Sequence, residues 1–143
     1  MKLTLEGIQN AAVWKSTGIL FPSYDVPAAQ KKAVEAPKWV HFGIGNIFRV
    51  FIGGIADGLL EQGLLDRGIT CVETFDYDVV DKIYRPYDNL GLQVILNPDG
   101  TRDVRVLGSF AEAVKAQYTD VAQWARLKEI FRAPSLQLVS FTI

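Results

Sequence analysis

The residues whose types and spacing can support chemistry begin with Gly43-Ile44-Gly45. Gly43 permits a tight turn, and Gly45 lets the backbone approach a diphosphate without a Cβ in the way. If a helix starts after this turn, the exposed N–H groups near Asn46 and Ile47 can bind the phosphate charge, supported by the helix dipole. The spacing therefore predicts a nucleotide-binding turn.

Two further residues qualify this prediction. Phe48 stands where the usual six-residue motif has its third glycine. Arg49 is either a cation near the phosphates or a solvated helix residue. A lone Gly-x-Gly is weak evidence, but an apolar strand before it and a helix after it strengthen the interpretation.

The second part of such a site is an acidic residue at the end of the next strand, which accepts hydrogen bonds from ribose hydroxyls. Glu73, Asp76 and Asp78 are the candidates, and Asp76 and Asp78 lie past the expected strand end. No Lys or Arg lies between Thr70 and Asp81, so a 2′-phosphate would meet carboxylates. This favours NAD over NADP as the cofactor. The alternative is that Asp76 or Asp78 only caps the short helix that follows.

His41 and Cys71 are the only histidine and the only cysteine. One of each cannot build a zinc-dependent alcohol dehydrogenase site within this chain, so no metal site is expected. We interpret His41 as a satisfied core histidine and Cys71 as a small buried hydrophobe. A lone cysteine fits a reducing cytoplasm. No nucleophile has a paired base, so no catalytic residue is assigned.

Three segments must position the turn. An apolar run at 39–42 predicts a buried strand of a parallel sheet, residues 46–62 have a helical period, and residues 69–75 predict a second strand. The helix is expected to bury one stripe of apolar side chains: Phe48, Ile52, Ile55 and Leu59.

Residues 1–38 are interpreted as an irregular N-terminal arm, placed before a dinucleotide-binding domain at 39–143. Short helices are expected at 5–15 and at 26–37, the second bounded by prolines. The arm is expected to pack over another part of a larger protein.

The second half of the chain alternates turn signals with β-rich runs. Pro98-Asp99-Gly100 predicts an antiparallel hairpin at about 90–108. A short helix is expected at 110–116, a longer one capped by Thr119, and a last strand at 136–143. Together these elements predict a Rossmann-like α/β fold, with a mainly parallel sheet, helices on both faces and a hairpin insertion.

The composition is that of one soluble globular domain. The chain has 143 residues, of which 49% are hydrophobic and 22% charged, which is enough to bury a core. Its formal net charge of −1 indicates no electrostatic surface for nucleic acid. No stretch approaches the roughly 20 continuous apolar residues of a membrane span. We therefore expect no nucleic-acid and no membrane partner.

The segment from Trp39 to Arg49 resembles the N-terminal glycine motif of the mannitol dehydrogenase family of long-chain polyol dehydrogenases, which includes fructuronate and tagaturonate reductases. That motif runs Gly-x-Gly-x-Phe-x-Arg-Ala, and Arg49 matches its arginine. The resemblance extends to 73–78, to the segment after 87–89 and to 138–143. Mannitol-type enzymes have His-Arg-Ala-His where this chain has Phe-Arg-Val-Phe, so the chain is more similar to the uronate reductase branch.

The resemblance implies an enzyme that transfers hydride between NAD and a polyol or keto-sugar acid, with lysine as acid/base and no metal. The implied substrates are mannitol and fructose, or the mannonate/fructuronate and altronate/tagaturonate pairs. The family's catalytic lysine, asparagine and histidine lie in a C-terminal helical domain, to which no residue here corresponds. The chain is therefore expected to be truncated at its C-terminus, to supply cofactor binding only and to be inactive alone.

Two other functions remain open at this point. The chain is alternatively a non-catalytic nucleotide-sensing or regulatory Rossmann domain, since fold does not determine function. A third interpretation is a structural domain whose Gly-x-Gly is only a tight turn. Because surface normally covered by a missing domain would be exposed, we expect the chain to self-associate.

Overall fold

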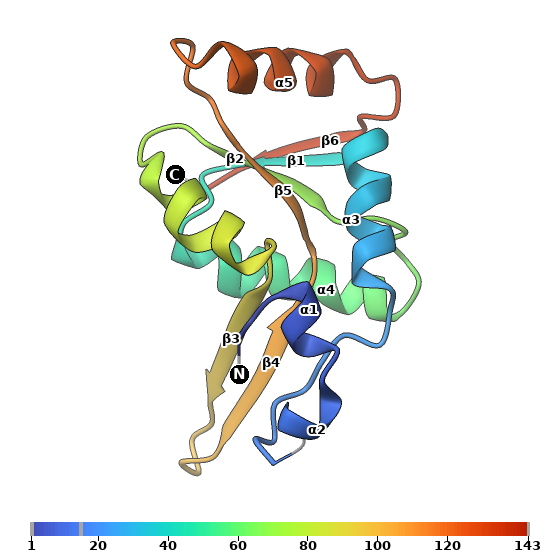
Figure 1. The fold of residues 1–143 in the computed structure, drawn as a ribbon, viewed down its shortest axis with the longest axis vertical. Helices are drawn as coiled ribbons and strands as arrows, with labels where there is room; N and C mark the ends of the chain where they lie inside the picture. Colours follow the sequence, from blue (N-terminus) through green and yellow to red (C-terminus); the bar gives the residue numbers. More distant parts are fainter. Residues whose placement is uncertain (1, 15, 143) are drawn as a thin grey trace.

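The computed structural model describes residues 2–14 and 16–142 and is built around a four-stranded parallel sheet (Figure 1). In the spatial order β5-β2-β1-β6, the strands are β5 (Phe110–Lys115), β2 (Ile69–Glu73), β1 (Trp39–Phe42) and β6 (Leu138–Phe141). All three neighbouring pairs are parallel. A sheet that grows from β1 in both directions is the doubly wound arrangement, which confirms the predicted Rossmann-like class.

Helices cover both faces of this sheet. All five residues of β2 are buried as a result. Successive side chains of a strand point to opposite faces. Cys71 packs with the helical segments at 48–61 and 80–84, whereas Val72 packs with α5 (Val121–Arg132) on the other face. Burial on both faces is typical of a strand inside a parallel sheet.

The helix after the glycine turn begins as a π-helical turn, η1 (Phe48–Ile52), and continues as α4 (Gly53–Glu61). This changes which side chains are buried. Phe48 is fully buried, but Ile55, expected on the same stripe, is 49% exposed, so that part of the prediction was wrong. A π turn holds one extra residue, which rotates the rest of the helix by about 100°. The inward face of α4 is therefore made by other residues: Gly53, Ala56, Asp57 and Leu60.

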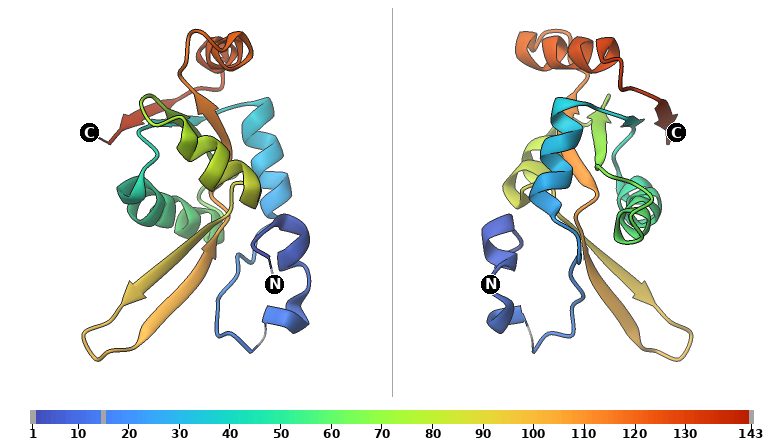
Figure 2. Two further views of the ribbon diagram at one scale, coloured as in Figure 1. Left: turned by 60° about the vertical axis from the view of Figure 1, so that its left-hand side comes forward. Right: turned by 90° about the vertical axis from the view of Figure 1, so that its right-hand side faces the viewer.

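The predicted hairpin is confirmed as β3 (Gly91–Leu96) and β4 (Arg102–Leu107), an antiparallel pair. Its turn is closed by Asn97, whose N–H donates to the Thr101 carbonyl at 3.0 Å. Gly100 there has φ +85°, a conformation that glycine adopts without strain. Figures 1 and 2 show the hairpin pointing away from the sheet, at the opposite end of the molecule from α5.

Residues 110–116 were predicted as a short helix, and this was wrong, because they form β5. The alanines at 111, 113 and 116 favour helix locally. In the fold, β5 pairs in parallel with the whole of β2 and buries Phe110 and Val114. Pairing with a central strand outweighs a local preference of a few tenths of a kcal/mol per residue.

The arm before β1 contains α1 (Leu5–Ile8), α2 (Ala11–Trp14) and α3 (Val26–Glu35). The single helix expected at 5–15 is thus two separate turns, whereas the helix expected at 26–37 is confirmed. The α3 helix is joined to the sheet by Gln30, whose side-chain amide donates to the Phe110 carbonyl at 3.1 Å. No helix in the described residues is both long enough and apolar enough to cross a membrane.

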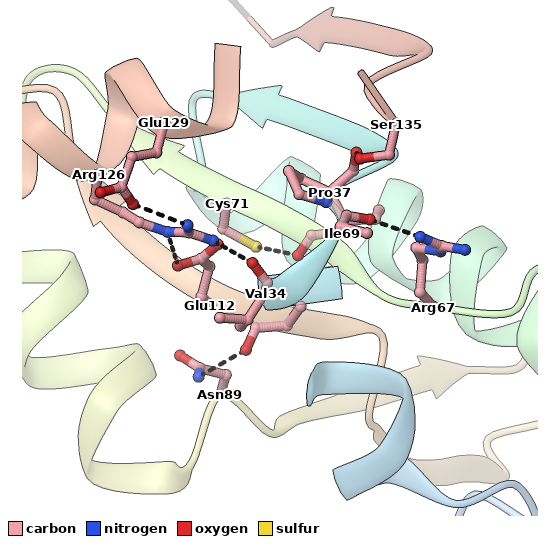
Figure 3. A network of polar contacts seen from close by, with 12 residues as sticks. Val34, Pro37, Arg67, Ile69, Cys71, Asn89, Glu112, Arg126, Glu129 and Ser135 are labelled. Carbon is pink, nitrogen blue, oxygen red and sulfur yellow. Dashed lines mark hydrogen bonds and ion pairs between the residues drawn. The ribbon is translucent and has the colours of Figure 1, made fainter. Parts of the chain in front are cut away.

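The polar network in Figure 3 joins strand β5, at the edge of the sheet, to the helices α5 and α3. Arg126 of α5 donates to both carboxylate oxygens of Glu112 on β5, at 3.0 and 2.6 Å, and to the Val34 carbonyl of α3 at 2.7 Å.

The α5 helix is capped by Asp120, which accepts from the Gln123 N–H at 3.1 Å, and not by Thr119 as expected. Between η2 (Val80–Tyr84) and β3 lies a 3-10 turn, η3 (Arg85–Tyr87).

Candidate functional site

The glycine turn joins the carboxyl end of β1 to η1, and its geometry requires Gly43. This residue has φ +86°, and a Cβ built on it would lie 2.5 Å from the Thr142 carbonyl oxygen. Its N–H donates to the Val72 carbonyl at 3.0 Å, and its carbonyl accepts from the Thr142 hydroxyl at 2.5 Å. The Gly43 backbone is therefore held between the ends of β2 and β6.

The three residues after Ile44 leave their backbone donors open. None of the described hydrogen bonds uses the N–H of Gly45, Asn46 or Ile47. A Cβ on Gly45 would meet nothing within 4 Å, so this glycine faces open space. These unpaired N–H groups stand at the amino end of a helix, where an anion is favoured.

A hollow of about 340 Å³ lies over this turn. Its lining combines the turn with the ends of the neighbouring strands: Gly43, Gly45, Asn46, Ile47, Phe48, Glu73, Asp76, Val79 and Thr142. Of the eight residues predicted for the site, six meet here. Phe48 contributes its backbone, because its side chain is fully buried and stacks on His41 at 4.3 Å.

Arg49 lies beside the hollow and does not line it. Its guanidinium turns back onto the turn, where it donates to the Ile44 carbonyl at 3.4 Å and to the Asn46 side-chain oxygen. Within the described residues it forms no ion pair with a carboxylate. Arg49 thus places an uncompensated positive charge close to the open N–H groups.

The three acidic candidates have different environments. Glu73 is only 7% exposed, and its Oε1 accepts from the backbone N–H groups of Thr74, Phe75 and Asp76 at 3.0, 3.0 and 3.3 Å. Its Oε2 accepts from the Ile44 N–H at 3.4 Å. Glu73 therefore organises both loops at this edge of the sheet.

Asp76 and Asp78 are separated by the structure. Asp76 is exposed at the hollow, and no described hydrogen bond uses its carboxylate. Asp78 does not line the hollow and pairs with Lys82 at 2.7 Å. No described backbone N–H donates to either carboxylate, so neither caps the helical segment that begins at Asp78, and the capping alternative is wrong for both.

His41 and Cys71 lie in the core, as expected. His41 is fully buried, with Nδ1 2.7 Å from the Ser140 hydroxyl and Nε2 3.2 Å from the Thr142 hydroxyl. Burial lowers the pKa of His41 below its ordinary value of 6.5. Burial likewise raises the pKa of the Cys71 thiol, which leaves it un-ionised and unreactive.

Two residues at the site were missed by the sequence reasoning. The Tyr84 hydroxyl donates to the Ile44 carbonyl at 2.9 Å, and Thr142 lines the hollow. Burial raises the pKa of Tyr84, so it remains a hydrogen-bond donor. Thr142 follows the last strand, and the rule that sites gather at the carboxyl ends of parallel strands identifies its position.

The sheet order, the glycine turn and the hollow over it define a Rossmann-type domain. No family model matches the chain. D-mannonate oxidoreductase of Thermotoga maritima is 48% identical over 143 residues, which are 100% of this chain and 26% of that protein.

Two solved structures have the same fold over 100% of this chain and 27% of theirs, each at 25% identity. They are mannitol 2-dehydrogenase of Pseudomonas fluorescens in ternary complex with NAD and D-mannitol, with a TM-score of 0.78, and D-sorbitol dehydrogenase in substrate-free form, with a TM-score of 0.76. These likenesses confirm the resemblance to the N-terminal domain of the mannitol dehydrogenase family. The chain spans about a quarter of the length of these relatives.

Proposed function

We propose that this chain is the NAD-binding portion of an oxidoreductase that transfers hydride between NAD and a polyol or keto-sugar acid. The observation that carries the proposal is the set of three unpaired N–H groups at Gly45, Asn46 and Ile47, which open onto a hollow with the unpaired Asp76 carboxylate. This donor and acceptor set fits a dinucleotide, whose diphosphate needs N–H donors and whose ribose needs an acceptor. When bound, the nicotinamide would accept or donate the hydride.

The fit to NAD is also supported by the mannitol 2-dehydrogenase structure, which is a complex with NAD and D-mannitol and whose fold matches all of this chain. Gly43 positions the turn, Arg49 adds positive charge beside it, and the Phe48 side chain anchors the helix in the core. The non-catalytic sensing alternative is not favoured, because the relatives are oxidoreductases by name.

For the substrate we favour a sugar acid of the mannonate/fructuronate type. The support is the 48% identical D-mannonate oxidoreductase, against 25% for the two polyol dehydrogenases. The chemistry at the substrate is assigned to residues outside this chain, so the 143 residues alone should not oxidise NADH in the presence of fructuronate. We also place the protein in the cytoplasm, since Cys71 is a buried free thiol.

Calorimetric titration with NAD and with NADP tests the cofactor assignment. We expect NAD to bind more tightly than NADP, and Gly45→Val to abolish binding, because a branched side chain would fill the space above the open N–H groups. Circular dichroism would verify that the variant is folded. Unchanged NAD binding by folded Gly45→Val, or no binding by the wild type, would contradict the proposal.

A further inference from the structure

Four polar groups join β1 and β6 to the glycine turn in one continuous chain. The Trp39 indole N–H donates to the Ser140 Oγ at 2.7 Å, and Ser140 Oγ lies 2.7 Å from His41 Nδ1. His41 Nε2 lies 3.2 Å from Thr142 Oγ1, which in turn donates to the Gly43 carbonyl at 2.5 Å. These hydrogen bonds form a chain that runs from the start of β1 to the backbone of the glycine turn.

The Gly43 end of this hydrogen-bond chain and the burial of His41 together determine the direction of the bonds to the imidazole. An indole N–H can only donate, so the Ser140 oxygen accepts from Trp39, and its own proton and second lone pair remain available to His41 Nδ1. A carbonyl can only accept, so the Thr142 proton goes to Gly43 and Thr142 Oγ1 accepts from Nε2. Burial keeps His41 neutral, so its single proton is on Nε2, and Nδ1 accepts from the Ser140 hydroxyl.

The Gly43 carbonyl at the end of this chain is adjacent to the open donors. Gly43 has φ +86° and no side chain, so only its backbone contacts hold its orientation. The Thr142 hydroxyl restrains the peptide that joins Gly43 to Ile44, immediately before the N–H groups of Gly45 and Asn46. If this restraint is lost, those N–H groups lose their fixed direction.

We propose that His41, Ser140 and Thr142 are positioning residues for the phosphate-binding turn; the inference rests on the NAD-binding function proposed above. They do not act as acids or bases. They hold the Gly43 peptide so that the N–H groups after it are already aimed at the diphosphate before it arrives. Pre-orientation of this kind raises affinity because less freedom is lost on binding.

The test compares hydroxyl deletions by NADH fluorescence titration. Thr142→Val keeps the shape of the side chain and removes its hydroxyl, and we expect about tenfold weaker NADH binding. Ser140→Ala, which does not touch the hollow, should weaken NADH binding by about threefold through His41. Thr142→Ser restores the hydroxyl and should restore affinity.

The matched control is Thr70→Val. Thr70 is a fully buried threonine of β2 whose hydroxyl has no hydrogen-bond partner in the described residues. The Thr70→Val substitution makes the same chemical change in the same sheet and should leave NADH affinity unchanged. If Thr142→Val and Ser140→Ala lower only the unfolding temperature and leave NADH affinity at the wild-type value, the three residues are merely structural and the proposal is overturned.

A second measurement needs neither NADH nor a variant. In nitrogen-15 NMR spectra at neutral pH, the single imidazole should show a protonated Nε2 and an unprotonated Nδ1. A proton on Nδ1 would break the deduced direction of the chain and overturn the proposal. If the wild type did not bind NADH, the cofactor assignment and the positioning role would fail together, while the tautomer would still show whether the hydrogen-bond chain exists. If it binds and the hydroxyl variants bind equally well, only the positioning role fails.

Discussion

At the scale of single residues, the site depends on which acid is left without a partner. Glu73 satisfies four backbone N–H groups and Asp78 pairs with Lys82, so within residues 2–14 and 16–142 only Asp76 presents an unpaired carboxylate to the hollow. Acids that lie close together in the sequence thus have different environments.

We predict that Asp76→Asn weakens NAD binding by about tenfold or more, because a hydrogen bond to a charged acceptor contributes about 1.5–3 kcal/mol. The same change should reduce the preference for NAD over NADP, since the repulsion of a 2′-phosphate is removed. The matched variant Asp78→Asn should bind as the wild type does. Isothermal calorimetry of both variants decides the assignment, and a larger effect at Asp78 would reverse it.

His41 gives the fold a pH dependence with a definite sign. Its pKa is lowered by burial, so the folded chain binds this proton less readily than the unfolded chain does. The contribution of neutral His41 to stability is therefore complete above about pH 6.5 and is lost as the pH falls below that value toward the folded-state pKa.

Urea unfolding at pH 7.5 and pH 5.5 measures this effect. The wild type should lose more unfolding free energy between these two conditions than His41→Phe, which keeps the stacking on Phe48 and removes the titrating ring. Because His41 is the only histidine, the difference between the two proteins isolates it. Equal losses would show that His41 does not titrate differently in the two states.

At the scale of elements, the π turn η1 decides how α4 meets the sheet and the hairpin. It brings Gly53 and Gly54 inward, against Phe110 and the Gln93 side chain, while Gly58 meets open space. Two glycines that appear equivalent in the sequence, Gly53 and Gly58, therefore differ in packing.

We predict opposite effects for alanine at these two positions. Gly53→Ala places a methyl group against the Phe110 ring and should lower the unfolding free energy by about 1–3 kcal/mol. Gly58→Ala removes only backbone freedom in a helix interior and should raise it by up to about 1 kcal/mol. Chemical denaturation of both variants would test the pair, and a stabilised Gly53→Ala would mean that α4 does not pack as described.

At the scale of the whole molecule, much apolar surface is uncovered. The hairpin exposes Leu92 and Leu96 at 47% and 75%, and β6 exposes Phe141 at 64%. The chain also spans only about a quarter of its relatives' length. A surface of this kind favours burial against another surface.

We therefore predict that the 143-residue chain self-associates. Light scattering over a concentration series should show the mean mass rising above 15.9 kDa. Leu96→Lys, at the most exposed of these hairpin positions, should shift association to higher concentration, and Lys82→Glu, on an exposed helical segment, serves as a charge-change control. A mass that stays at the monomer value at all concentrations would contradict the prediction.

The sequence by itself determined the strand, glycine turn and helix at 39–62, the hairpin and the resemblance to the family. These are properties of neighbouring residues: apolar periodicity, a glycine where φ is positive, and a Pro-Asp-Gly turn. The tertiary structure alone decided that 110–115 is a strand, because pairing with β2 overrides local helix preference. It also decided the phase of α4, the choice of Asp76 over Asp78 at the hollow, and the bond from Thr142 to Gly43. Those outcomes depend on contacts between residues far apart in the sequence. No local sequence pattern specifies such contacts.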